Sequence, residues 1–286
     1  MNILERIRSG RLIADGAMGT MLQSMGLRVG AAPESWNIDK PENVLAVHKA
    51  YTDVGCELLT TNTFGCNKLR QRRSKYSIAE LAAAGVSLAR EAADNAGHSC
   101  YVALDVGPLG AFLEPLGTVS FDEATALFAE SIAAGAEKAD CVLIETMGDT
   151  REASAAVKAA KENCTLPVFS TFSVDKNGRL LSGEDLPTML ARMTDAGVDA
   201  LGCNCGLGPE EFLPFAESLC GKTDLPLIFS LNAGLPVFAD GKTVYPLSPE
   251  AFADNVKKIA ALGGSVFGGC CGTGPAYIEQ LVRVLK

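Results

Sequence analysis

Short runs of apolar residues recur eight times along the chain, and longer amphipathic stretches separate them. The runs are rich in Val, Ile, Leu and Phe and are nearly continuous, which is typical of parallel strands buried on both faces. Each run therefore predicts one strand of a parallel sheet. The runs are Arg11–Asp15, Cys56–Asn62, Tyr101–Val106, Cys141–Glu145, Pro167–Ser173, Ala200–Cys205, Pro226–Asn232 and Ser265–Cys271.

The stretches between the runs carry the apolar spacing and the end signals of helices. Apolar residues recur three and four positions apart in Phe121–Lys138, as they do on the buried face of a helix. Two further helices are predicted to begin at Gly208–Glu211 and at the first residues of Ser248–Ile259. At each place a Gly or Ser precedes a Pro that suits the first helical turn. Gly197 and Gly263 lie where helices are expected to end.

Eight strands that alternate with helices predict a (β/α)8 barrel, the TIM barrel of the α/β class. A doubly wound open sheet is the alternative, because it uses the same alternation. No Gly- or Ser-rich linker divides the sequence, so residues 1–286 are interpreted as a single domain. A barrel of this kind commonly takes about 250 residues or more, which the chain supplies.

Composition narrows the class of protein. The hydrophobic content of 48% excludes a disordered chain, and the net charge of −9 argues against a nucleic-acid-binding protein, which needs a basic face. No apolar run reaches the ~18 residues of a membrane span, and Met1–Gly10 lacks the apolar core of a secretory signal. We therefore expect a cytoplasmic protein that binds neither nucleic acid nor membrane.

The ten cysteines are interpreted mainly as small buried side chains, because a disulfide framework is typical of short secreted chains. Cys56, Cys100, Cys141 and Cys164 fit that interpretation, since they lie in or beside the apolar runs. Three other cysteines lie at the ends of predicted strands and need a different explanation.

Polar or metal-binding residues end the predicted strands. The catalytic groups of a (β/α)8 barrel lie at the carboxyl ends of its strands, so this pattern indicates an enzyme. The residues at these ends are Asp15, Asn62, Asp105, Glu145, Ser173, Cys205, Asn232, Cys270 and Cys271.

Cys205 ends the sixth strand, and Cys270 and Cys271 end the eighth. These strands are next-but-one neighbours around a barrel, so their ends can converge. Both members of the Cys270–Cys271 pair can face one point only if the strand has already broken into a turn, for which the flanking glycines supply the freedom. Three thiolates suit Zn²⁺ and leave its fourth position open, which is the arrangement of a catalytic site.

A strained vicinal disulfide and plain packing are the alternatives for the cysteine pair. Cys203 is expected to face the same side as Cys205 but to lie about 6–7 Å deeper, beyond the ~2.3 Å of a zinc–sulfur bond. Cys203 is therefore predicted to be a core residue and not a fourth ligand.

Seven motifs in one order, spread over nearly the whole chain, resemble those of the homocysteine S-methyltransferases, which are zinc-dependent barrels that make methionine. The two motifs that carry the cysteines are highly specific. Within the family, the first motif and Gly272 resemble the homocysteine module of cobalamin-dependent methionine synthase. The motifs are Asp15–Thr20, Thr61–Gly65, Gly107–Gly110, Glu145–Thr146, Asn204–Cys205, Asn232–Gly234 and Gly268–Thr273.

The resemblance implies an enzyme that transfers a methyl group to the thiol of homocysteine. A free thiol is mostly protonated at pH 7, and zinc coordination removes its proton, so zinc on Cys205, Cys270 and Cys271 would supply a nucleophilic thiolate. Asp15 and Glu145 match family positions associated with homocysteine, and we expect them to bind its ammonium group.

The other end of homocysteine needs donors for its carboxylate. The backbone N–H groups of Ala17, Met18 and Gly19 are expected to supply them. Two interpretations of Asn232 stay open: a cap of the local turn, or a side-chain oxygen that stands in as a zinc ligand before the substrate binds. His48 and His98 lie away from the strand ends and are interpreted as non-catalytic.

The methyl donor is expected to be a methyl-corrinoid on a separate protein. The motifs resemble the cobalamin-dependent branch, and the chain ends at Lys286 without a corrinoid domain. The loops Gly19–Trp36 and Phe64–Tyr76 are predicted to form the docking surface. The second loop carries a basic run that is otherwise a solvated face, made of Arg70, Arg72, Arg73 and Lys75.

Two alternatives to this function stay open at the level of sequence. One keeps homocysteine as the acceptor and takes the methyl group from S-methylmethionine, S-adenosylmethionine or betaine. The other is a non-enzymatic protein that binds zinc or a thiol. The carboxylates at the strand ends argue against the second, because storage needs no recognition of an amino acid.

Overall fold

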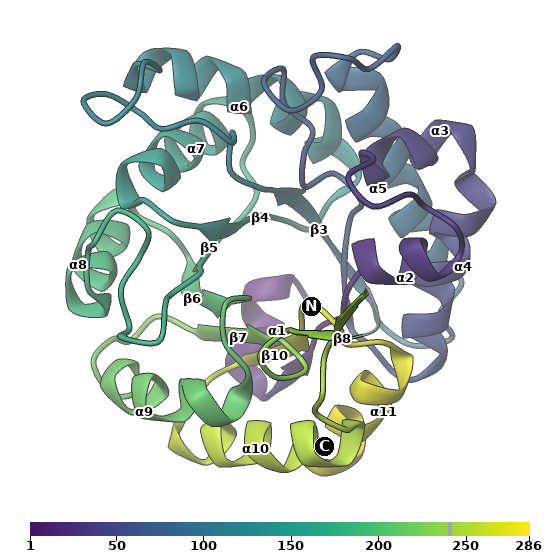
Figure 1. Ribbon diagram of the computed structural model, residues 1–286, viewed down its shortest axis with the longest axis vertical. Coiled ribbons are helices and arrows are strands. Elements are labelled where there is room, and N and C mark those ends of the chain that lie inside the picture. The colour runs from purple at the N-terminus through teal and green to yellow at the C-terminus, as the bar shows by residue number, and fades with distance from the viewer. Residues whose placement is uncertain (240–241) are drawn as a thin grey trace.

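Eight parallel strands form a barrel in the computed structural model, which describes residues 1–239 and 242–286 (Figure 1). The order around the barrel is β1, β10, β7, β6, β5, β4, β3 and β2, and a parallel bridge between Ala14 and Leu58 joins its two ends. The predicted (β/α)8 barrel is confirmed, and the open-sheet alternative is wrong. The strands are β1 (Leu12–Ile13), β2 (Leu58–Thr60), β3 (Tyr101–Val106), β4 (Cys141–Met147), β5 (Val168–Phe172), β6 (Ala200–Asn204), β7 (Leu227–Leu231) and β10 (Val266–Gly269).

Helices cover the outside of the barrel. The helix predicted over Phe121–Lys138 is present as α6 and the short 3-10 helix η2 (Ala136–Lys138). The helix predicted to begin at Ser248 is also present, and Ser248 caps it, since its Oγ accepts a hydrogen bond from the Ala251 N–H. Gly197, with a φ of 77°, ends its helix as predicted. The outer helices are α4 (Pro41–Asp53), α5 (Ile78–Asp94), α6 (Phe121–Gly135), α7 (Thr150–Asn163), α8 (Leu186–Ala196), α9 (Pro209–Leu219), α10 (Pro249–Leu262) and α11 (Pro275–Leu285).

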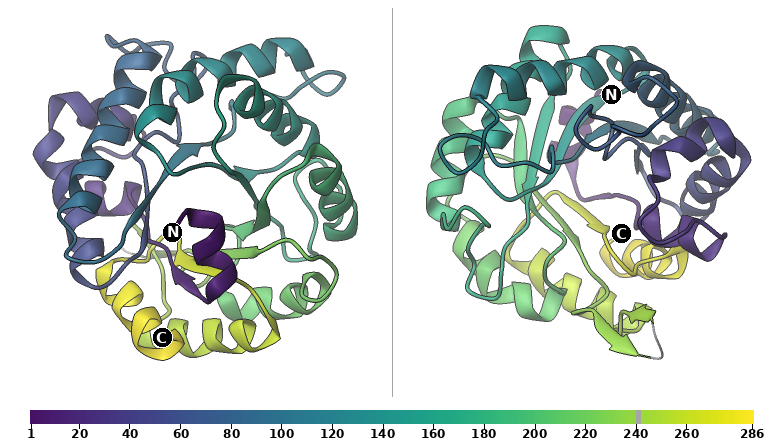
Figure 2. Two further views of the ribbon diagram at one scale, coloured as in Figure 1. Left: turned by 180° about the vertical axis from the view of Figure 1, so that it is seen from behind. Right: turned by 45° about the horizontal axis from the view of Figure 1, so that its top comes forward.

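A separate helix, α1 (Ile3–Ser9), closes the amino-terminal end of the barrel (Figure 2, left). Ile3 and Ile7 are each 2% exposed and belong to the apolar cluster inside the barrel. Arg6 and Lys286 each form an ion pair of 2.8 Å with Glu57, so α1 and the end of α11 are tied to the start of β2. The sequence patterns did not predict this helix.

The carboxyl end of the barrel carries further elements that the sequence patterns did not predict. The segment Gly19–Trp36, expected to be a loop, contains α2 (Gly19–Ser24) and the 3-10 helix η1 (Pro33–Ser35), and α3 (Trp36–Asp39) follows it. Between β7 and α10, the strands β8 (Val237–Ala239) and β9 (Lys242–Val244) form an antiparallel hairpin that projects from the barrel (Figure 2, right).

Across residues 1–239 and 242–286, no helix is both long and apolar enough to cross a membrane. All ten cysteines lie in this part of the chain and are free thiols. Cys56 and Cys141 are buried as expected, whereas Cys100 and Cys164 are partly exposed. The interpretation of residues 1–286 as a single domain stays a prediction.

Candidate functional site

Three cysteine sulfurs meet at the carboxyl end of the barrel. The Sγ atoms of Cys205, Cys270 and Cys271 all lie within 4.8 Å of one another, and those of Cys205 and Cys271 are 3.8 Å apart. A tetrahedral ion with zinc–sulfur bonds of about 2.3 Å sets its sulfurs about 3.8 Å apart. Within the described residues this is the one such group of potential metal ligands, and its spacing and chemistry fit a zinc ion.

The end of β7 holds all three cysteines in place, because this strand lies between β6 and β10. The Cys205 N–H donates to the Ser230 carbonyl at 3.0 Å, and the Cys270 N–H donates to the Leu231 carbonyl at 2.8 Å. The Cys271 N–H donates to the side-chain oxygen of Asn232 at 3.0 Å. The predicted convergence of the strand ends is therefore achieved through a shared neighbour.

Cys205 reaches the site through an unusual backbone conformation. Its φ is 58°, in the left-handed region that non-glycine residues rarely adopt. Cys203 points the other way and packs in the core between the barrel and the helices, 1% exposed. The burial of Cys203 is as predicted, but the expectation that both cysteines face one side is wrong, because the turn at Cys205 redirects its side chain.

The pair Cys270–Cys271 lies just after β10, in a turn, as predicted. Gly272 supplies the left-handed conformation, with a φ of 82°. Gly269 serves a different need from the one expected: a Cβ there would lie 2.2 Å from the Thr273 hydroxyl, so this glycine permits close packing. The turn lets two successive sulfurs face the same point.

Neighbouring groups stabilise negative charge on one sulfur of this cluster. Contacts with Cys205 and Cys270 lower the pKa of the Cys271 thiol to about 3, and the nearby Tyr245 hydroxyl adds to this effect. The same cluster raises the pKa values of the Cys205 and Cys270 thiols. A thiolate is the form that binds a metal, so the site already favours one ligand in its binding state.

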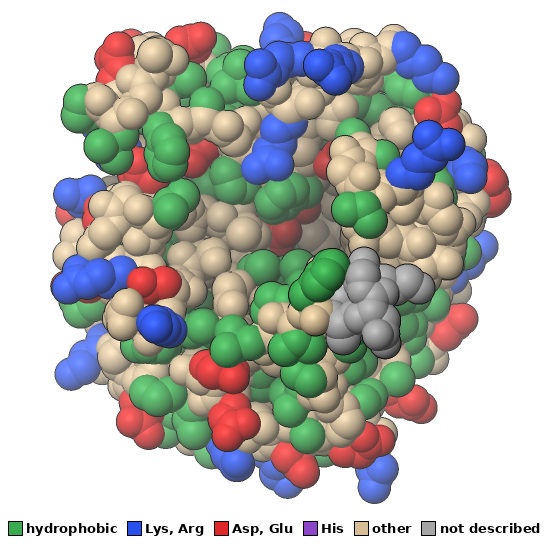
Figure 3. Space-filling view, viewed as in Figure 1, with side chains coloured by type: hydrophobic (Ala, Val, Ile, Leu, Met, Phe, Trp, Pro, Cys, Tyr) green, Lys and Arg blue, Asp and Glu red, His purple; other side chains and the backbone are tan. Residues whose placement is uncertain are grey.

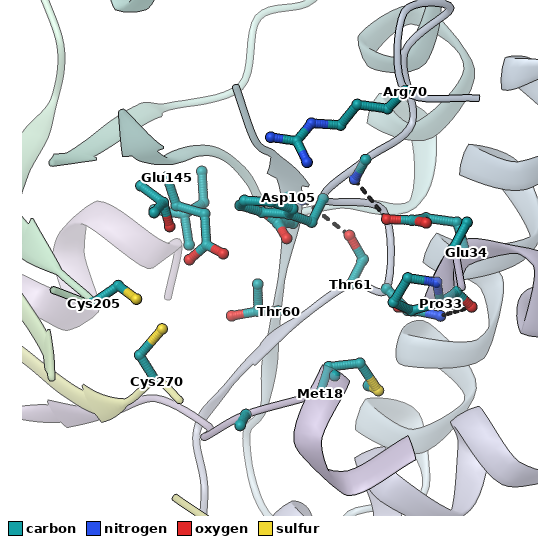
Figure 4. A pocket seen from close by; sticks show the side chains of 18 of the residues that line it. Met18, Pro33, Glu34, Thr60, Thr61, Arg70, Asp105, Glu145, Cys205 and Cys270 are labelled. Atoms are coloured by element: carbon teal, nitrogen blue, oxygen red, sulfur yellow. Dashed lines mark hydrogen bonds between the residues drawn. The ribbon is translucent and has the colours of Figure 1, made fainter. Parts of the chain in front are cut away.

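Carboxylates line the pocket opposite the sulfurs (Figure 4). Asp15 accepts hydrogen bonds from the N–H and the Oγ1 of Thr60, at 2.7 and 2.9 Å. Burial raises the pKa of Asp15 to about 7. Burial also raises the pKa of Glu145 to about 8, with the nearby Cys205 and Asp15 adding to the effect. Both groups would be stabilised as anions by a bound cation.

Asp105 is a third carboxylate at this place, and the sequence patterns identified it only as a strand end. Burial first, and then the charge of Glu145, raise its pKa well above the ordinary value. Its Oδ1 atom is buried and has no hydrogen-bond partner in the part of the chain that the structure describes. Figure 4 shows its side chain between Glu145 and Thr61, within the pocket. An unpaired buried carboxylate oxygen indicates a missing cationic or donor partner.

Asn204 lies between the cysteines and the carboxylates and forms hydrogen bonds with the residues around it. The sequence patterns indicated no role for this residue. Its side-chain oxygen accepts hydrogen bonds from the Thr146 N–H and the Thr171 hydroxyl, both at 2.8 Å. Its side-chain nitrogen donates to the Thr146 hydroxyl at 2.7 Å and to Glu145 at 3.4 Å. Asn204 therefore fixes where Glu145 and Thr146 lie. Its place directly before Cys205 was the available signal.

The structure also places the remaining residues that the sequence singled out. The Ala17 N–H donates to the Thr273 carbonyl at 3.1 Å, so binding a substrate carboxylate there would require this bond to break. Met18 precedes α2 and lines the pocket. The Asn232 oxygen is bonded to Cys271 N–H, as in a local cap. His48 is buried in α4, and the His98 ring bonds the Cys56 carbonyl, both outside the pocket.

The pocket that these groups line has a volume of about 1360 Å³ and opens at the mouth of the barrel. Figure 3 shows the hollow, with acidic side chains inside it and Lys and Arg side chains along part of its rim. The residues of the basic run, Arg70, Arg72, Arg73 and Lys75, belong to its lining. The volume exceeds the ~300–1,000 Å³ of sites for drug-sized ligands, so the pocket has room for more than a small amino acid.

Comparison with known proteins identifies the same family that the sequence motifs resemble. The sequence profile of the homocysteine S-methyltransferase family matches residues 12–285. The methionine synthases of Mycobacterium leprae (strain TN) and Mycobacterium tuberculosis (strain ATCC 25618 / H37Rv) are 33% and 32% identical over 304 residues, which cover 99% of this chain and 25% of each relative. The chain thus spans a quarter of the length of these relatives.

Solved structures share the fold. The homocysteine methyltransferase MmuM from Escherichia coli, in its metallated form, superposes with a TM-score of 0.81 at 24% identity over 96% of both chains. Its oxidized form superposes with a TM-score of 0.84 over 99% of both chains. The carboxyl transferase domain of Rhizobium etli pyruvate carboxylase shares the barrel more distantly, with a TM-score of 0.52 at 13% identity.

Proposed function

The chain belongs to the homocysteine S-methyltransferase family, and from this premise we propose that it transfers a methyl group to the thiol of homocysteine, giving methionine. The observation that carries the proposal is the cluster of three sulfurs facing three carboxylates across one pocket. A thiol and an ammonium group at the two ends of one small substrate would match these two sets of groups.

Zinc on Cys205, Cys270 and Cys271 is the cofactor that we propose. When bound, it would supply a positive charge that keeps the substrate thiol in its nucleophilic, deprotonated form. The proton leaves to solvent, the sulfur forms a bond to the methyl carbon, and the electrons of the broken bond stay with the donor. The cysteine positions set by β7 leave the pocket side of the cluster open to the substrate sulfur.

Asp15, Asp105 and Glu145 hold the ammonium group in this proposal. A cation between them would lower the cost of ionising these carboxylates, whose pKa values are raised by burial. The α-carboxylate would lie near the backbone N–H groups of Met18 and Gly19 at the start of α2, where Ala17 also lines the pocket. Asn232 would act on the substrate indirectly, through its hydrogen bond to the Cys271 N–H. These contacts would fix the substrate sulfur relative to the cysteines.

For the donor, we propose a methyl-corrinoid carried by a separate protein that docks at the barrel mouth. The size of the pocket and the basic run on its rim support a donor larger than S-methylmethionine or betaine. The methionine synthases that the chain resembles are consistent with it. A cytoplasmic location is part of the same proposal.

A donor panel tests the proposal. Zinc-loaded protein and homocysteine are combined with a methylated corrinoid protein, free methylcobalamin, S-methylmethionine, S-adenosylmethionine or betaine, and methionine is measured. We expect fastest turnover with the corrinoid protein and slow turnover with S-methylmethionine. Fast turnover with S-methylmethionine and none with either corrinoid would replace the donor. A failure to form methionine from any donor would contradict the activity.

A single variant separates substrate binding from metal binding. Glu145→Gln removes one charged partner of the ammonium group, which should weaken homocysteine binding about ten- to a hundredfold. Zinc content should stay near that of the wild type. Glu137→Gln, on the outer surface in η2, is the matched control. An unchanged KM for homocysteine in Glu145→Gln would remove this residue from the substrate site.

A further inference from the structure

The β8–β9 hairpin returns to the barrel directly beside the cysteine cluster. Val237 and Phe238, on its outgoing strand, are 47% and 81% exposed. The return strand leads to Tyr245, which is half-buried and whose ring lies against Gly272, the residue after Cys271. The Tyr245 hydroxyl is near enough to Cys271 to help lower the pKa of its thiol. A solvent-exposed element thus carries a side chain that lies beside a proposed zinc ligand.

The ring of Tyr245 packs closely on the backbone of the cysteine turn. A Cβ placed on Gly272 would lie 2.3 Å from Cγ and 2.5 Å from Cβ of Tyr245. Such distances mean that the residue after Cys271 must lack a side chain while the ring is in this position. Gly272 therefore serves two purposes, the left-handed turn and the seat of the aromatic ring.

Hydrogen bonds fix the segment after Tyr245 to the same turn. The Leu247 N–H donates to the Ala233 carbonyl at 3.1 Å, and the Ala233 N–H donates to the Cys271 carbonyl at 3.0 Å. The Tyr277 hydroxyl, from α11, donates to the Leu247 carbonyl at 2.7 Å. These bonds hold the segment beside the cysteine turn from the barrel side, so the place of Tyr245 next to Cys271 does not depend on the exposed end of the hairpin.

We propose that Tyr245 is a positioning residue of the metal site, whose hydroxyl donates a hydrogen bond to the Cys271 sulfur and orients it as a ligand. Three thiolates around one divalent ion leave a net negative charge, and a donor to one sulfur withdraws part of it. Groups that hydrogen-bond to metal ligands typically change metal affinity or activity about 10–100-fold. The inference rests on the proposed zinc site and adds to it a residue outside the three cysteines.

Tyr245→Phe tests this role, because it keeps the ring on Gly272 and removes only the hydroxyl. Tyr101→Phe is the matched control, since its hydroxyl donates to the Met1 carbonyl on the opposite end of the barrel. Zinc affinity is measured by competition with a chromophoric chelator. Cobalt(II)-substituted protein reports the sulfur-to-metal charge-transfer band, and thermal unfolding of the metal-free protein checks that both variants fold.

We expect Tyr245→Phe to bind zinc at least tenfold more weakly and to shift the cobalt band to longer wavelength, because an unbonded thiolate is easier to oxidise. Tyr101→Phe should match the wild type in both. Wild-type affinity and an unshifted band in Tyr245→Phe would overturn the inference and leave Tyr245 as packing. A wild-type protein whose cobalt band is absent, or persists in Cys205→Ala, would instead overturn the zinc site.

Discussion

At the scale of single residues, the site is built from conformations that cost free energy. Thr146 and Cys205 both have a φ of 58°, and they are the non-glycine residues with positive φ in the described part of the chain. Such a residue costs on the order of 1–3 kcal/mol unless its surroundings impose the conformation. Asn204 imposes part of it here, since it bonds both the N–H and the hydroxyl of Thr146.

The cysteines give the first prediction at this scale. Alanine at Cys205, Cys270 or Cys271 should each remove bound zinc, because two sulfurs cannot replace three in this geometry. Cys203→Ala should keep the metal, since that side chain lies in the core. Metal analysis of the purified variants measures the zinc content per chain. Zinc lost from Cys203→Ala but retained by one of the other three would reassign the ligands.

Asp15 gives a prediction about pH. Its pKa rises from the ordinary 3.8 to about 7 on folding because the carboxyl is buried. The folded state therefore binds a proton more tightly, so this group's contribution to stability is present below about pH 4 and is lost as the pH rises to about 7. The free energy of unfolding of Asp15→Asn, relative to that of the wild type, should therefore rise by on the order of 2 kcal/mol from pH 5 to pH 8.

Urea unfolding at pH 5 and pH 8, without substrate or metal, measures this difference. Asp122→Asn is the control, because that carboxyl is exposed in the first turn of α6. A stability difference between Asp15→Asn and wild type that is the same at both pH values would show that Asp15 titrates normally in the folded protein.

Much of the site could be predicted from single residues, and the limits have physical causes. The cysteines and the carboxylates of the site were both identified from their positions at strand ends, because the carboxyl ends of all strands in a parallel barrel lie at the same end of the barrel. The direction of the Cys205 side chain was mispredicted. Side chains stop alternating between the two faces of the strand where the backbone adopts the left-handed conformation at Cys205. Asp105, Asn204 and Tyr245 come to the site through contacts between distant segments, which no local pattern records.

At the scale of elements, helix α1 shows how a short segment completes the barrel. Isolated helices of seven residues are not stable in water, so α1 exists because it buries Ile3 and Ile7 against the barrel interior. In the sequence, Met1–Gly10 stands out only by lacking the apolar core of an export signal. Its helical pattern spans two turns, too few for periodicity to identify.

Ile7→Ala tests this packing. Removal of a fully buried Ile side chain should lower the free energy of unfolding by about 2–5 kcal/mol. Zinc content of the folded protein should not change, because the site lies at the other end of the barrel. Arg8→Ala, an exposed change in the same helix, is the control. A loss of less than 1 kcal/mol in Ile7→Ala would mean that α1 is not part of the core.

At the scale of the whole molecule, charge is unevenly placed. The chain has a net charge of −9, yet four basic residues gather in one loop at the pocket mouth, in Arg70–Lys75. Arg72 and Arg73 are exposed, and neither forms an ion pair in the described residues. A positive patch on an acidic protein attracts an acidic partner and speeds its association.

The double variant Arg72→Glu and Arg73→Glu tests docking of the proposed corrinoid protein. Its KM for that protein should rise about three- to tenfold at low ionic strength, and the difference should shrink in high salt. Turnover with free methylcobalamin should not change. Lys257→Glu, on the outer face of α10, is the control. Equal KM values for the double variant and the wild type at low salt would exclude this loop from docking.

Helix α1 also bears on the order of events in the proposed reaction. Because α1 closes one end of the barrel, homocysteine and the methyl donor of that reaction would share the entrance at the other end, and the sulfur cluster lies on the inner side of it. A large donor seated at the mouth would block the path of the amino acid behind it. Homocysteine would then have to enter first and methionine leave last. A donor that arrives early would form an unproductive complex, and an excess of donor would slow the reaction that it feeds.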